Sequence, residues 1–161
     1  MLIRLLAYRL SKTWGGRVSV PKIGFIGAGT VGTALAVRLR RREYSVVAVA
    51  SRTRASAERL AKVVDGCRVY SSGQEVADAA ELVFITTPDD AIGSVVSQIN
   101  WHPGQSVVHC NGAESVDVLE SAMRCGAQVG GFHPLQTFAS VDYAIENLPG
   151  STFVLEGEGE L

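Results

Sequence analysis

The chain has 161 residues, 47% of them hydrophobic and 19% charged, which suits one buried core but is short for a two-domain dehydrogenase. The formal net charge of −1 provides no global field, and no apolar run is long enough for a membrane span, so we expect neither a nucleic-acid nor a membrane partner. Cys67, Cys110 and Cys125 lack CxxC spacing and no secretory signal precedes them, so we expect a reduced, cytoplasmic protein.

Residues 1–20 form a basic leader without any acidic residue. Its basic residues are Arg4, Arg9, Lys12 and Arg17. An organellar targeting segment or a surface anchor has a similar pattern. Since the first core strand begins near residue 22, we expect the leader to be a disordered or helical extension of the domain.

The strand expected over residues 22–27 leads into a glycine-spaced turn and then into a helix expected over residues 30–42. Gly27 allows the tight turn, Gly29 lets the backbone approach a pyrophosphate, and Gly32 lets the helix pack closely on the sheet. The helix N-terminus adds unpaired N–H groups and partial positive charge. The predicted dinucleotide-binding turn comprises Gly27, Ala28, Gly29, Thr30, Val31 and Gly32.

The second strand, expected over residues 46–51, ends about 20 residues after the turn, where an acidic residue selects NAD. The chain instead has Ser51, Arg52 and Thr53, whose hydroxyl and guanidinium groups bind phosphate. The expected cofactor is therefore NADP(H). The alternative is that Arg52 and Arg54 only begin the solvated helix expected over residues 54–64.

Apolar strand-like runs and helical patterns alternate along the remaining chain, which predicts an α/β fold. Further strands are expected over residues 67–70, 82–86, 106–110, 128–132 and 152–156, and further helices over residues 74–79, 90–99 and 115–125. We predict a doubly wound, mostly parallel Rossmann-type sheet with helices on both faces. Right-handed crossovers would bring the carboxyl ends of its strands, and the candidate site residues with them, to one edge.

The fourth strand runs into Thr86, Thr87 and Pro88. These residues could have a structural role only, in which Pro88 stiffens the loop and Asp89 or Asp90 caps the next helix. In a doubly wound sheet this loop also lies beside the second ribose and the nicotinamide of a dinucleotide. Thr86, Thr87 and Pro88 are therefore predicted to bind the cofactor.

Two histidines lie near the ends of the fifth and sixth strands, and Asn111 follows the first of them. Histidine can donate a proton to a carbonyl or imine as hydride arrives, because its pKa lies near working pH. His133, His109 and Asn111 are therefore the candidate catalytic residues. Alternatively, each histidine only holds a loop; a metal site formed with Cys110 lacks supporting ligand spacing, so no metal is expected.

These motifs resemble a bacterial family of Rossmann-like proteins that continue into the C-terminal domain of unknown function 2520. The most specific segment is residues 131–139, and the resemblance covers about residues 21–161. The N-terminal half is also similar to pyrroline-5-carboxylate reductases, F420-dependent NADP reductases and 6-phosphogluconate or β-hydroxyacid dehydrogenases. Asn111 departs from related sequences, which often have serine there, and this weakens a direct transfer of its role.

The resemblance implies a dinucleotide-binding domain over residues 21–150, and over residues 151–161 the start of a truncated helical domain that in related reductases supports dimerisation. We expect the NADP(H)-binding domain of an oxidoreductase that transfers hydride to or from a small carbonyl, imine or hydroxy compound. The alternative is a non-catalytic NADP(H)-binding sensor or regulatory module, because no Lys or Tyr beside the histidines requires an enzyme.

Overall fold

A computed structural model describes residues 20–157, so the basic leader, apart from Val20, lies outside the described residues. Seven strands lie close to their expected positions. They are β1 (Lys22–Ile26), β2 (Ser45–Ala50), β3 (Arg68–Val69), β4 (Leu82–Ile85), β5 (Ser106–His109), β6 (Gln128–Pro134) and β7 (Phe153–Gly157). β1, β4 and β5 are buried along nearly their whole length, which is typical of strands that are covered on both faces.

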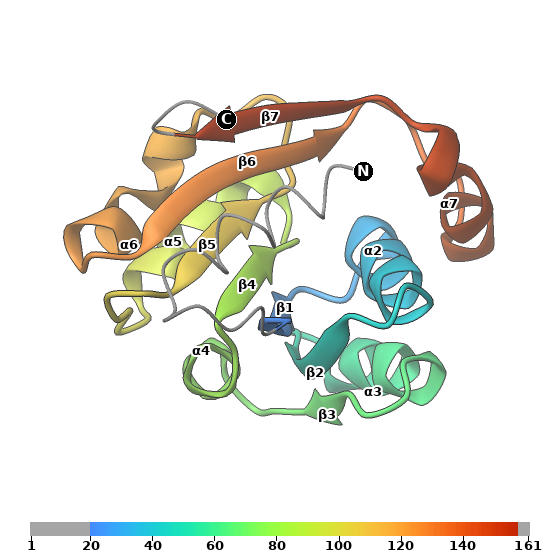
Figure 1. Ribbon diagram of the computed structural model, residues 1–161, viewed down its shortest axis with the longest axis horizontal. Coiled ribbons are helices and arrows are strands. Elements are labelled where there is room, and N and C mark those ends of the chain that lie inside the picture. Colours follow the sequence, from blue (N-terminus) through green and yellow to red (C-terminus); the bar gives the residue numbers. More distant parts are fainter. Residues whose placement is uncertain (1–19, 158–161) are drawn as a thin grey trace.

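The strands form one sheet in the order β3-β2-β1-β4-β5-β6-β7 (Figure 1). All neighbouring pairs from β3 to β6 are parallel, and β7 runs antiparallel to β6. The chain therefore has an α/β fold with a doubly wound, mostly parallel Rossmann-type sheet, as predicted. The strand order reverses between β1 and β4, which is where such sheets bind ligands.

Helices cover both faces of the sheet (Figure 1). They are α2 (Thr30–Arg40), α3 (Arg54–Val63), α4 (Gly73–Ala79), α5 (Ile92–Ser97), α6 (Glu120–Arg124) and α7 (Val141–Asn147), with 3₁₀ turns η1 (Asp89–Ala91), η2 (Val116–Leu119) and η3 (Leu148–Gly150). Residues of α2, α3 and α7 join one apolar cluster, and those of α4, α5 and α6 join another on the opposite face. No helix within residues 20–157 combines the length and apolar character needed to cross a membrane.

An aromatic ladder crosses the face that α2, α3 and α7 cover. Phe25 stacks on Phe84 with ring centroids 5.2 Å apart, and Phe132 stacks on Phe153 at 4.6 Å. Phe84 meets Phe132 edge to face at 6.1 Å. These contacts link β1 and β4 to β6 and β7, so the antiparallel edge strand shares the core of the parallel sheet.

Two parts of the chain differ from the expected elements. α7 was not predicted, because only Ala144 is buried among its seven residues and the helical periodicity is weak. Its start does carry a signal, since the Ser140 hydroxyl accepts a hydrogen bond from the Tyr143 N–H. β6 runs two residues beyond the expected strand because it pairs with β7 through Pro134. β7 extends the sheet past residue 150, and the start of a further domain over residues 151–161 stays a prediction.

Candidate functional site

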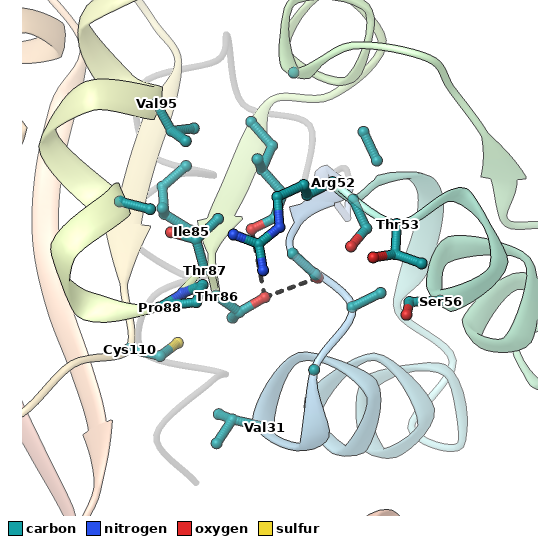
Figure 2. A pocket seen from close by; sticks show the side chains of 18 of the residues that line it. Val31, Arg52, Thr53, Ser56, Ile85, Thr86, Thr87, Pro88, Val95 and Cys110 are labelled. Carbon is teal, nitrogen blue, oxygen red and sulfur yellow. Dashed lines mark hydrogen bonds between the residues drawn. The ribbon is translucent and has the colours of Figure 1, made fainter.

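A pocket of about 850 Å³ lies at the carboxyl ends of the central strands (Figure 2). Its walls come from the glycine turn after β1, residues 51–53 after β2, residues 71–74 at the start of α4, residues 86–89 after β4, and residues 110–111 after β5. Every predicted cofactor-binding residue except Gly32 lines it. These residues are Gly27, Ala28, Gly29, Thr30, Val31, Ser51, Arg52, Thr53, Thr86, Thr87 and Pro88.

The three glycines of the turn meet different surroundings. Gly27 has a φ of +109°, and a Cβ there would lie 2.5 Å from the carbonyl group of Thr86. Gly32 packs against the Thr86 side chain, and its Cβ would lie 3.0 Å from the carbonyl oxygen of Gly27. Nothing lies within 4 Å of a Cβ built on Gly29, which lines the pocket. Packing therefore explains Gly27 and Gly32, while Gly29 leaves room for a ligand to reach the backbone.

The N-terminus of α2 faces the same pocket. Its first intrahelical bond runs from the Thr33 N–H to the Gly29 carbonyl at 2.9 Å, which leaves the N–H groups of the preceding residues without helical partners. No side chain caps this end, and its first turn holds no acidic residue. The unpaired donors and the helix dipole therefore favour an anion here.

The structure separates the two arginines after β2. Arg52 lines the pocket (Figure 2), and it makes no hydrogen bond or ion pair with any residue of the described range 20–157. Arg54 does not line the pocket, and its Nε lies 2.9 Å from Glu58 Oε1, one helical turn away. The solvated-helix alternative therefore describes Arg54, whereas Arg52 has a guanidinium group available to the pocket.

Thr86 and Thr87 also differ in their partners. The Thr86 hydroxyl donates a hydrogen bond to the Gly27 carbonyl at 2.9 Å, which ties β4 to the glycine turn (Figure 2). The Thr87 hydroxyl is buried and has no hydrogen-bond partner within the described part of the chain. Thr86 therefore has a structural role in the turn, and Thr87 has a hydroxyl to offer a ligand.

We expect Thr86→Val to lower the free energy of unfolding by about 1–2 kcal/mol, because the Gly27 carbonyl loses a partly buried donor. Thr87→Val is the matched control and should leave this free energy unchanged or raise it, since it removes a buried hydroxyl without a protein partner. Urea denaturation of both variants measures the difference. Equal losses would contradict the assigned roles.

The structure does not bring either histidine to the pocket wall. His109 is the last residue of β5 and only 1% exposed, and its Nδ1 accepts a hydrogen bond from the Asn111 N–H at 3.3 Å. His133 lies in β6, where its Nδ1 is 3.1 Å from the Cys110 carbonyl oxygen and its ring packs against Gly112. Each ring contacts the backbone of the loop that follows β5.

Burial is the main influence on the protonation of His109, and it lowers the pKa of this residue. The negative charges of Glu156 and Glu114 raise the pKa, and the neighbouring His133 lowers it. The neutral imidazole is therefore favoured in the folded protein. Burial also raises the pKa of the Cys110 thiol well above its usual range, so this pocket residue stays protonated.

Asn111 is the one candidate catalytic residue that lines the pocket. Its Oδ1 accepts a hydrogen bond from the Ala113 N–H at 2.8 Å. Since that N–H can only donate, the orientation of the amide is determined and its Nδ2 group points elsewhere. Nδ2 is buried and, within residues 20–157, has no partner, so Asn111 and Thr87 each carry a polar group that a ligand can satisfy.

Several lining residues were not predicted. They are Ser56, Ser71, Ser72, Gly73, Gln74 and Cys110, with others from the ends of β1, β2 and β4, from η1, and from α5 and the two residues that follow its C-terminus. The Ser72–Glu75 capping box was a usable signal, because it marks a helix start after the third strand, at the same sheet edge. Hydrogen bonds from Ser71 and Ser72 lower the pKa of Glu75. In the described range, no three His, Cys, Asp or Glu side chains gather as metal ligands would.

A family model described as a Rossmann-like domain matches residues 12–134. A solved structure from Bacteroides fragilis, described as a "putative NADP oxidoreductase", is 29% identical, with a TM-score of 0.73 over 86% of this chain and 52% of its own. No curated protein matches the sequence.

Two further solved structures share the fold. A reductive aminase from Aspergillus terreus, in complex with NADPH and ethyl-5-oxohexanoate, is 20% identical, with a TM-score of 0.62 over 74% of this chain and 42% of its own. An imine reductase from Pseudomonas sp. is 21% identical, with a TM-score of 0.62 over 73% of this chain and 42% of its own. The chain thus spans about half the length of the Bacteroides protein and less than half of these two enzymes.

Proposed function

Since the chain belongs to the Rossmann-like domain family, we propose that its pocket binds NADP(H). The observation that carries this proposal is the glycine turn, where Gly29 leaves the backbone accessible beside an uncapped helix N-terminus. The NADP oxidoreductase description of the Bacteroides protein supports it, as does the NADPH in the reductive aminase structure.

Each part of the pocket has a proposed role. The backbone from Gly27 to Gly32 and the N-terminus of α2 hold the pyrophosphate. Ser51, Arg52 and Thr53 hold the 2′-phosphate through hydroxyl and guanidinium groups. Thr87 and Pro88 lie beside the nicotinamide ribose, with the Thr87 hydroxyl as the available polar group.

We further propose that the protein is an oxidoreductase acting on a small carbonyl, imine or hydroxy compound, in which the bound nicotinamide supplies or accepts the hydride. Asn111 makes the direct contact, because its Nδ2 group can donate to an oxygen or nitrogen of the substrate. His109 and His133 do not contact the substrate; they position Asn111 by holding the loop that carries it. A homodimer formed through a further domain stays a prediction.

A sensor or regulatory module that binds NADP(H) without chemistry is the second candidate. One observation favours it: among the described residues that line the pocket there is no Lys, Tyr or His to donate a proton near neutral pH. In this case the binding of NADP(H) would control the activity of a partner protein, and Asn111 would contact only the cofactor.

Calorimetric titration with NADPH and NADH in parallel tests the binding proposal. We expect NADPH to bind more tightly by about 100-fold, as two or more charge-assisted hydrogen bonds to the extra phosphate would give. If neither nucleotide binds, the proposed function is wrong. Single-turnover oxidation of bound NADPH with ketones, imines and 2-oxoacids then separates the candidates, because an enzyme oxidises it and a sensor does not.

A further inference from the structure

Three residues on adjacent strands lie side by side on one face of the sheet, near its edge. His109 of β5 pairs with Gly131 of β6, which pairs with Glu156 of β7. Residues paired in this way project from the same face. A Cβ built on Gly131 would lie 3.4 Å from His109 Nε2 and 3.3 Å from Glu156 Cβ. The glycine therefore leaves the imidazole edge and the glutamate side chain facing each other with no side chain between them.

The His109 ring has a donor that needs an acceptor. Its Nδ1 accepts the Asn111 N–H, so in the neutral ring the proton is on Nε2. Nε2 is buried and has no hydrogen-bond partner among the described residues. A buried N–H group without an acceptor lowers the stability of the folded protein. We therefore expect an acceptor for the Nε2 proton beside Gly131.

Glu156 has the position and the freedom to be that acceptor. Its side chain is exposed, and its one described polar contact is Oε1 at 3.5 Å from the Ser115 hydroxyl, the outer limit for a hydrogen bond. Its negative charge is also the strongest electrostatic influence on His109 among the neighbouring groups. The carboxylate can therefore turn toward the imidazole without losing a strong partner.

We propose that Glu156 is a positioning residue whose carboxylate accepts the Nε2 proton of His109 over Gly131. The ring then keeps Nδ1 as the acceptor for the Asn111 N–H, and the Asn111 side chain stays at the pocket wall. Glu156 thus acts on the ligand through His109 and Asn111. The effect on the ligand rests on the proposed function, whereas the pairing of Glu156 with His109 does not.

This arrangement makes ligand binding depend on pH. The titratable groups whose charges act on His109 are Glu156 of β7, Glu114 of the loop after β5, and His133 of β6. Protonation of His109 puts a hydrogen on Nδ1, which then cannot accept the Asn111 N–H. The loop is therefore released as the pH falls through the titration of His109. Removing the Glu156 charge lowers the pKa of His109 further and moves this loss to lower pH.

The pairing is tested by ¹⁵N NMR of the histidine rings in the whole chain. We expect neutral His109 to carry its proton on Nε2, and its titration to move to lower pH in Glu156→Gln. Glu146→Gln, on α7, is the matched control and should leave that titration unchanged. An Nδ1-protonated tautomer, or a His109 titration that is the same in Glu156→Gln and wild type, would overturn the proposal.

The effect on the pocket is tested by NADPH affinity across a pH series. Glu156→Gln should retain the affinity at neutral pH, because its amide oxygen accepts the same hydrogen bond, and should lose affinity at lower pH than wild type does. Glu156→Leu has no acceptor and should lose about five- to tenfold at neutral pH, as expected for one hydrogen bond. If wild type binds NADPH while the Gln and Leu variants match it at every pH, the positioning role is wrong. If wild type binds no dinucleotide, the proposed function fails, and NMR still decides the pairing.

Discussion

Alanine at Gly29 is expected to reduce NADPH affinity at least about 100-fold while the protein keeps its stability, whereas alanine at Gly27 should strongly destabilise the fold. At Gly29 the backbone has φ −79° and ψ −170°, which any residue adopts, and a methyl group meets no protein atom within 4 Å. That methyl group instead occupies space over the turn where phosphate oxygens would reach the backbone N–H groups. The two variants therefore separate binding from folding.

Alanine at Gly27 is expected to lower the free energy of unfolding. The backbone at Gly27 has a φ of +109°, which residues with a side chain rarely adopt. An alanine Cβ there would also overlap the Thr86 carbonyl group and lie 2.8 Å from the Thr87 nitrogen. Because these are backbone atoms, they cannot move aside cheaply, and we expect a loss of more than about 3 kcal/mol in the free energy of unfolding. The change at Gly29 should stay within about 1 kcal/mol, the usual range for a helix N-cap.

Urea denaturation and calorimetry measure the two effects. Gly29→Ser provides a further control, because serine improves the cap of α2 and still adds a side chain over the turn. It should be as stable as wild type or more so, and should bind NADPH as weakly as Gly29→Ala. Wild-type affinity in either Gly29 variant would show that the turn is not the phosphate site.

Arg52→Ala is expected to lower NADPH affinity about 100-fold and to leave NADH affinity almost unchanged. The guanidinium of Arg52 lines the pocket, has no ion pair within residues 20–157, and can make two charge-assisted hydrogen bonds to a 2′-phosphate. Two such bonds account for about 3 kcal/mol, which corresponds to this loss. The measurement is the ratio of NADPH to NADH affinity by calorimetry.

Arg54→Ala is the matched control for Arg52→Ala, since Arg54 is two residues away and pairs with Glu58 on the surface of α3. We expect its affinity ratio to equal that of wild type. The preference of the wild type for NADPH should also weaken as salt is raised, because Arg52 is exposed and its attraction for phosphate is screened. Equal effects of the two substitutions, or a parallel loss of NADH binding, would contradict the assignment of the 2′-phosphate to Arg52.

The parts of the fold that could be predicted are those with strong local signals. The apolar strands and the spacing of Gly27, Gly29 and Gly32 depend on neighbouring residues, so the central sheet and the location of the pocket followed from the sequence. The helix Val141–Asn147 was missed because it buries few residues and depends on contacts with α2 rather than on periodicity.

The sequence by itself determined the α/β class and the residues that gather at the carboxyl ends of the strands. Tertiary structure alone decided which of these residues line the pocket: Arg52 rather than Arg54, and Asn111 rather than the histidines. It also placed His109, Gly131 and Glu156 in one row. The reason is physical: strand periodicity and turns are local, whereas a side chain's partner depends on register between strands distant in sequence and on burial from both faces.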